Sequence, residues 1–102
     1  MADITEARKA LVTGILEGDG KASRAYRRAA FDNARLAEPW SSLCNKIAER
    51  AHEVTDADIA AARASGLTED QIFEILVCAA VGQSTRQYET AIAALYAATG
   101  KD

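Results

Sequence analysis

Three helix-start patterns in the second half of the chain constrain its fold more than any other feature. In each, a hydroxyl side chain is followed three residues later by an acid or an amide: Thr55 with Asp58, Thr68 with Gln71, and Ser84 with Gln87. The first side chain accepts a hydrogen bond from the later backbone N–H, and the later side chain reaches back. Gly66 and Gly100 suit helix ends. We therefore predict a short helix closed by Gly66, then helices over residues 69–81 and 85–99, or one long helix kinked near Gly82.

The first half shows apolar residues at helical spacing. They predict helices over about residues 3–17, 22–34 and 39–53, with Pro39 at the first position of the third. On the first helix one face carries Ile4, Ala7, Leu11, Ile15 and Leu16. No stretch alternates apolar and polar residues for long, so no strand is predicted. The expected fold is all-α, a compact single-domain bundle of about six helices over residues 1–102.

The segment from Ile75 to Val81 is apolar on every side. Such a helix is buried all round, so it is either the central helix or covered by another subunit. The chain has only 102 residues and is rich in alanine, which buries little area per residue. We therefore expect it to bury more surface in a homo-oligomer.

Charge and composition exclude some classes of protein. The net charge of -3 argues against a general nucleic-acid binder. The start of the chain has no basic or apolar region typical of a secretory signal, and the longest apolar run is far shorter than the roughly 20 residues of a membrane span. We expect a cytoplasmic protein without a membrane segment, in which Cys44 and Cys78 are reduced.

Residues 54–59 (VTDADI) and 62–74 (ARASGLTEDQIFE), followed by an alanine-rich helix, resemble the alkylhydroperoxidase D and carboxymuconolactone decarboxylase superfamily. The resemblance extends from about Trp40 to Leu95. It implies a compact all-α fold and a symmetric homo-oligomer, commonly a trimer or hexamer, with a dimer also possible. Peroxidase members carry a Cys-x-x-Cys-x-x-x-His motif with an upstream Glu.

This chain departs from that motif. Alignment on Gly66 places Ala51 and Val54 at the two cysteine positions and Asp58 at the histidine position. Glu38 matches the upstream Glu only after a slip of register. Without the cysteine pair the reversible disulfide of a dithiol peroxidase cannot form, so the resemblance indicates a short branch that lacks this motif.

His52 and Glu74 are the candidate catalytic residues. His52 is the only histidine, and its ordinary pKa suits proton transfer near neutrality. Glu74 enters an apolar helix, where we expect burial to raise its pKa. The alternatives are an exposed histidine in the last turn of its helix, and an ion pair between Glu74 and an arginine across a subunit contact.

Trp40, Arg86 and Tyr88 are candidate ligand-binding residues, although helical spacing alone also explains Trp40 and Tyr88 as core or interface residues. Arg86, expected in the first turn of the last helix, has an unfavourable position relative to the helix dipole, and Glu74 is its expected partner. A further cationic set could bind an anion or form a solvated or inter-subunit face: Arg24, Arg27, Arg28 and Arg35.

Three functions follow, in decreasing order of support. The first is a non-redox, homo-oligomeric protein that binds a small molecule, such as a small carboxylate, or has an accessory role. The second is a cofactor-independent decarboxylase or isomerase in which His52 and Glu74 move protons. The third is a thiol peroxidase acting through Cys44 or Cys78, although Cys78 lies among apolar residues as a buried structural cysteine does. No metal or cofactor is expected.

Overall fold

The computed structural model describes residues 2–34 and 36–100, and this part of the chain consists of helices joined by loops, with no strand. The all-α prediction is confirmed. In place of six helices the described residues form five α-helices and one turn of 3-10 helix: α1 (Ala2–Glu17), α2 (Arg24–Phe31), α3 (Trp40–Arg50), η1 (Ala51–Glu53), α4 (Asp56–Ala64) and α5 (Glu69–Thr99).

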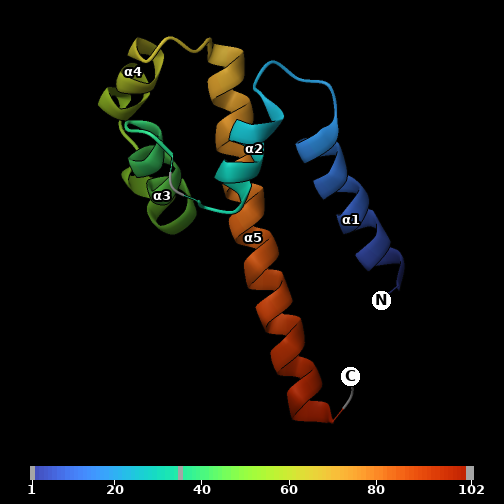
Figure 1. Ribbon diagram of the computed structural model, residues 1–102. Helices are drawn as coiled ribbons and strands as arrows, with labels where there is room; N and C mark the ends of the chain where they lie inside the picture. Colours follow the sequence, from blue (N-terminus) through green and yellow to red (C-terminus); the bar gives the residue numbers. More distant parts are fainter. Residues whose placement is uncertain (1, 35, 101–102) are drawn as a thin grey trace.

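The first half of α5 is the centre of the fold. All four other α-helices contact α5, and Figure 1 shows α2, α3 and α4 gathered around its upper half. The residues of α5 that face them are buried: Ile72, Ile75, Cys78, Ala79 and Gly82. They pack with Leu16, Phe31, Trp40 and Leu43, among others, in one core. Of the two interpretations of residues 75–81, a central helix or a helix covered by another subunit, the central position is found on this side, while Ala80 on the other side is exposed.

Two of the three predicted helix starts are confirmed. Thr55 and Asp58 form a reciprocal capping box at α4, and Thr68 and Gln71 form one at α5. At the second box the Gln71 backbone N–H donates to Thr68 Oγ1 over 3.2 Å, and the Thr68 N–H donates to Gln71 Oε1 over 2.8 Å. These side chains satisfy backbone N–H groups that have no partner within the helix.

The third predicted helix start is wrong, because α5 continues without a break from Glu69 to Thr99, as the alternative prediction of one long helix expected. The Ser84 hydroxyl donates back to the Val81 carbonyl over 3.0 Å, as a serine inside a helix can. Gly82 lies inside the helix, and a Cβ atom there would overlap the carbonyl group of Phe31 at the end of α2, which explains why this position is a glycine. This glycine permits close packing and does not end the helix.

The helices of the first half are shorter or oriented differently than predicted. α2 starts after Ser23, whose hydroxyl caps it, and ends at Phe31 and not at residue 34. On α1, only Leu16 of the predicted apolar face is buried, while Ile4 and Leu11 remain 49% and 56% exposed. Ile15 of the predicted face is partly buried against the core, and Val12, which that face did not include, packs there as well.

The molecule is elongated, so the prediction of a compact bundle is wrong. Its radius of gyration is 15.3 Å, against about 13 Å for a compact domain of this length. Figure 1 shows the cause, since α1 and the second half of α5 extend away from the bundle as two separated arms. Among the described residues, none of the helices combines the length and the apolar character that crossing a membrane requires.

Candidate functional site

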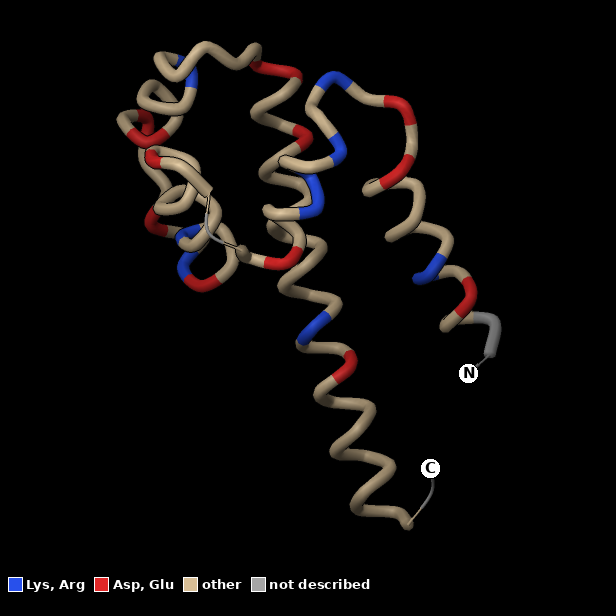
Figure 2. Tube along the Cα trace, in the orientation of Figure 1, with Lys and Arg blue, Asp and Glu red and all other residues tan. Residues whose placement is uncertain are grey.

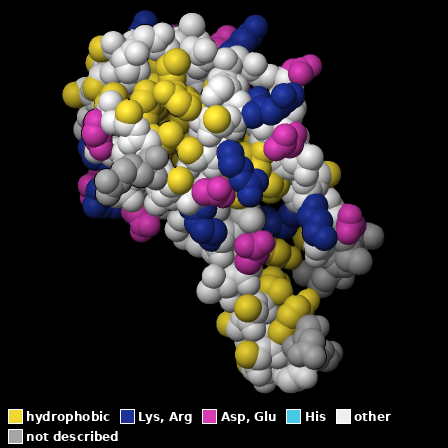
Figure 3. All heavy atoms as spheres, in the orientation of Figure 1, with side chains coloured by type: hydrophobic (Ala, Val, Ile, Leu, Met, Phe, Trp, Pro, Cys, Tyr) yellow, Lys and Arg dark blue, Asp and Glu magenta, His cyan; other side chains and the backbone are white. Residues whose placement is uncertain are grey.

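A groove of about 920 Å³ lies between α1, the end of α2 and the second half of α5. Its apolar wall consists of Val12, Phe31, Tyr88, Ile92 and Tyr96. Figure 3 shows Lys and Arg side chains interspersed with Asp and Glu side chains near the two arms, and apolar side chains along the lower part of α5. Of the residues predicted to bind a ligand, Arg86 and Tyr88 line this groove and Trp40 does not.

Arg8 connects the two walls of the groove. Its guanidinium carbon lies 4.2 Å from the centroid of the Tyr88 ring, within the range of a cation–π contact. This contact joins α1 to α5 and also holds a positive charge at the groove surface.

Arg86 belongs to the closed end of the groove, where α2 meets α5. Its guanidinium donates to the carbonyl of Phe31 over 2.5 Å and to Gln83 Oε1 over 3.0 Å. The prediction that Glu74 is its partner is wrong. Arg86 lies in the interior of α5, so the expected conflict with an N-terminal dipole does not arise, and its charge meets the C-terminal carbonyl of α2, where the dipole favours a cation.

The lining of the groove is positive although the chain is acidic. Four cationic side chains line it, Arg8, Lys9, Arg28 and Arg86, against two anionic ones, Asp32 and Glu89, for a net +2. Asp32 is already paired with Arg28 over 3.2 Å. Among the described residues Lys9 has no ion-pair partner, so its ammonium is free to meet an anion.

Glu74 lies outside this groove and has a structural role. Its carboxylate accepts hydrogen bonds from the backbone N–H of Lys21 over 2.8 and 2.9 Å and from that of Ala22 over 3.1 Å. These bonds, first those of Lys21 and then that of Ala22, hold the pKa of Glu74 below its usual value despite some burial. The expected raised pKa is wrong, because these backbone N–H groups stabilise the charged form.

Arg27 contacts the same loop between α1 and α2. It is 5% exposed and donates to the carbonyl oxygens of Ile15, Gly18 and Ala22 over 2.8 to 3.1 Å. Arg24 donates to the Glu17 carbonyl over 3.1 Å. Both guanidinium groups therefore satisfy carbonyls at the C-terminal end of α1 and in the loop after it.

The predicted cationic face on α2 therefore does not act as one anion site. Arg27 is buried in the loop and Arg24 caps α1, whereas Arg28 pairs with Asp32 and reaches the groove. Arg35 lies outside the described residues.

His52 is in η1, and its side chain is 82% exposed. Its Nε2 lies 3.8 Å from Glu53 Oε2, and Glu53 also pairs with Arg50 over 3.2 Å. Glu74 lines a separate hollow of about 280 Å³ with Arg27 and Cys78, and His52 does not line it. His52 thus has the exposed position of its alternative interpretation, and no contact in the described part of the chain links it to Glu74.

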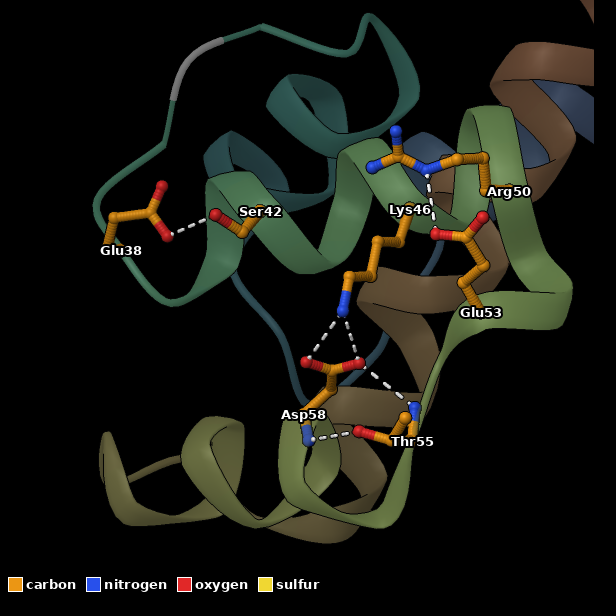
Figure 4. A network of polar contacts seen from close by, with 7 residues as sticks. All are labelled: Glu38, Ser42, Lys46, Arg50, Glu53, Thr55 and Asp58. Carbon is orange, nitrogen blue, oxygen red and sulfur yellow. Dashed lines mark hydrogen bonds and ion pairs between the residues drawn. The ribbon is translucent and has the colours of Figure 1, made fainter.

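The positions that align with the redox motif carry structural contacts instead, as Figure 4 shows for Asp58 and Glu38. Lys46 Nζ donates to both carboxylate oxygens of Asp58 over 2.9 and 3.1 Å. This pairing and the Thr55 backbone N–H hold the pKa of Asp58 below its usual value. Glu38 accepts a hydrogen bond from the Ser42 hydroxyl over 2.6 Å. Asp58 therefore stabilises the start of α4 through its ion pair with Lys46 and its capping box with Thr55. Glu38 contacts the first turn of α3 through Ser42.

Cys44 on α3 and Cys78 on α5 are free thiols buried in the core. Burial, with a smaller effect of Cys78, raises the pKa of Cys44 to about 11. Burial also raises the pKa of Cys78, although Arg27 opposes the shift. A thiol held protonated and away from solvent is a poor nucleophile.

Trp40 is also a core residue, 3% exposed, and its indole N–H donates to Ser65 Oγ over 3.1 Å.

Within the described residues, no three or more His, Cys, Asp or Glu side chains form a group that could hold a metal ion. The shape of the groove and the contacts of Glu74 and Arg27 with the loop after α1 were not predictable from sequence periodicity, because both depend on how α1 sits against α5.

Comparisons with protein-family models, with curated proteins and with solved structures found no match. Membership of the carboxymuconolactone decarboxylase superfamily therefore stays a prediction from the sequence.

Proposed function

We propose that this chain is a non-redox, homo-oligomeric protein of the carboxymuconolactone decarboxylase-like type that binds a small apolar carboxylate. One observation carries the ligand class: the groove between α1 and α5 has an apolar wall and a net charge of +2, from four cations and two anions, in a chain of net charge -3. Ligand sites in proteins commonly combine an apolar lining with a few polar groups that orient the ligand.

The parts of the groove suit the two parts of such a ligand. Tyr88 and Ile92 offer apolar contact, and the ammonium of Lys9 is available for a carboxylate. Arg8 is already fixed over the Tyr88 ring, which places a second positive charge without further ordering on binding.

Two-dimensional amide NMR spectra test this proposal with naphthoate as the probe and naphthamide as its neutral analogue. We expect naphthoate to shift the amide signals of Lys9, Val12 and Tyr88 and to bind more tightly than naphthamide. Lys9→Gln should weaken naphthoate binding by up to about five-fold, because one exposed charge contact contributes up to about 1 kcal/mol, and should leave naphthamide binding unchanged.

Arg63→Gln is the matched control, since it removes a cation on α4 that pairs with Glu69 away from the groove. It should change neither titration. Equal affinity for the acid and the amide, or shifts confined to residues outside the groove, would show that the groove does not select a carboxylate.

A further inference from the structure

The last part of α5 forms an arm that its own chain leaves largely uncovered. Residues 90–99, here called the tail segment, continue the helix beyond the core. Figure 2 shows that this stretch carries no Lys, Arg, Asp or Glu. Every one of its residues except Ile92 is exposed, including Leu95 at 53% and Tyr96 at 37%.

Exposure of such an uncharged helix on most sides is unusual for a protein in water. A solvated helix usually has a polar face, and one that is apolar on all sides is normally buried. Helices in proteins gain most of their stability from packing, and isolated helices shorter than about 12–15 residues are marginal even when rich in alanine. The tail segment is alanine-rich but has packing on one side only, where Ile92 and Tyr96 line the groove.

The exposed area of the molecule is too large for its mass. The chain exposes 6605 Å², whereas a compact monomer of 10.9 kDa exposes about 5,600 Å². The excess of about 1,000 Å² is close to the roughly 800 Å² that each partner buries in a standard protein interface. The excess is therefore sufficient for one stable contact with another molecule.

The chemistry of the surface selects a second copy of the same chain as the occupant. A surface without charges offers no complementarity to a charged partner. It can, however, meet its own copy around a symmetry axis without like-charge repulsion, since the same residues contribute from both sides. Leu95 does not line the groove, so a contact centred on it leaves the ligand site open.

We propose that the tail segment packs against the same segment of a second copy, with Leu95 near the centre of the contact. This inference rests on the proposed homo-oligomer and names its interface. In the assembly the tail segments form a shared apolar core outside the bundle, and each bundle keeps its own groove.

Sedimentation equilibrium of the full chain tests the interface with Leu95→Glu. We expect the wild type to sediment with a mass of two or more chains at micromolar concentration. Leu95→Glu should weaken the association at least about tenfold, as loss of a central apolar contact does. Glutamate is a good helix former, so far-UV circular dichroism should show the helix retained. Ala91→Glu, which removes no large side chain, should act in the same direction.

Phe73→Glu is the matched control on the same helix, since Phe73 is 69% exposed but lies outside the tail segment. It should leave the mass unchanged. A monomeric wild type, or equal dissociation by Phe73→Glu and Leu95→Glu, would overturn the proposed interface. Naphthoate titration of Leu95→Glu separates the two proposals, because retained shifts at Lys9 would show ligand binding independently of the tail contact.

Discussion

Gly82 in the middle of α5 lies directly against the carbonyl group of Phe31, the last residue of α2. A Cβ atom on Gly82 would overlap the carbonyl oxygen, the carbonyl carbon and the Cα of Phe31. One turn further along α5, Arg86 donates to the same carbonyl oxygen. The missing side chain of Gly82 thus lets the end of α2 pack closely against α5, and the Arg86 guanidinium holds it there.

Gly82→Ala should destabilise the protein by about 1–3 kcal/mol, the usual result of forcing extra volume into a packed contact. Alanine favours a helix by about 1 kcal/mol over glycine, but the backbone of Phe31 cannot yield as a flexible side chain would. The measurement is urea unfolding followed by circular dichroism.

Gly14→Ala is its control within α1, because a Cβ atom there has nothing within 4 Å. This substitution should stabilise the protein by up to about 1 kcal/mol through helix propensity alone. If both substitutions stabilised the protein, the close contact between α2 and α5 would be refuted.

Glu74→Gln should destabilise the protein by about 1 kcal/mol at neutral pH, because an amide replaces a carboxylate that accepts three charge-assisted hydrogen bonds. Since the pKa of Glu74 is lowered in the folded state, its stabilising effect is complete above the ordinary value of 4.5. It is lost as the pH falls through the lower folded value.

The difference in stability between the wild type and Glu74→Gln should therefore be constant above that range and shrink toward zero in more acidic solution. Denaturant unfolding at a series of pH values measures it. Glu49→Gln, at an exposed position on α3, is the control and should show no such convergence. A difference that grew on acidification would mean that the folded state does not favour the charged carboxylate.

The two native thiols should be inert in the folded protein. Cys44 and Cys78 are 2% and 1% exposed, and the pKa of Cys44 is raised to about 11 by burial, so little thiolate exists at neutral pH and reagents cannot reach it. An aromatic disulfide reagent followed by absorbance should label neither cysteine promptly in buffer and both in denaturant. Prompt labelling of the folded chain would reopen the thiol peroxidase alternative.

The sequence predicted most reliably where the signal is local. The capping boxes at Thr55 and Thr68 involve residues three positions apart, so their hydrogen bonds follow from the chain itself. The apolar composition of residues 75–81 also indicated a buried helix, although Ala80 on its outer side is exposed. The Ser84 pattern has the same local form, yet it lies inside a helix, where the Ser84 hydroxyl donates back to the Val81 carbonyl.

The candidate site was much less predictable. Arg86 and Tyr88 were expected to bind a ligand and both line the groove, but the role of Glu74 depends on a loop that lies more than 50 residues earlier in the chain. Arg27 is buried against the same loop. Periodicity shows which face of a helix is apolar and not which backbone groups will meet it. For the same reason the exposure of Leu11 on α1 was not foreseen.

The central position of α5 also orders the events of synthesis. Every other α-helix packs on it, yet it is translated after all of them. Residues 2–64 thus leave the ribosome with their apolar faces uncovered, and the core closes only when the stretch through Gly82 has emerged. The tail segment follows that stretch, so the surface proposed for self-association is the last part of α5 to be synthesised.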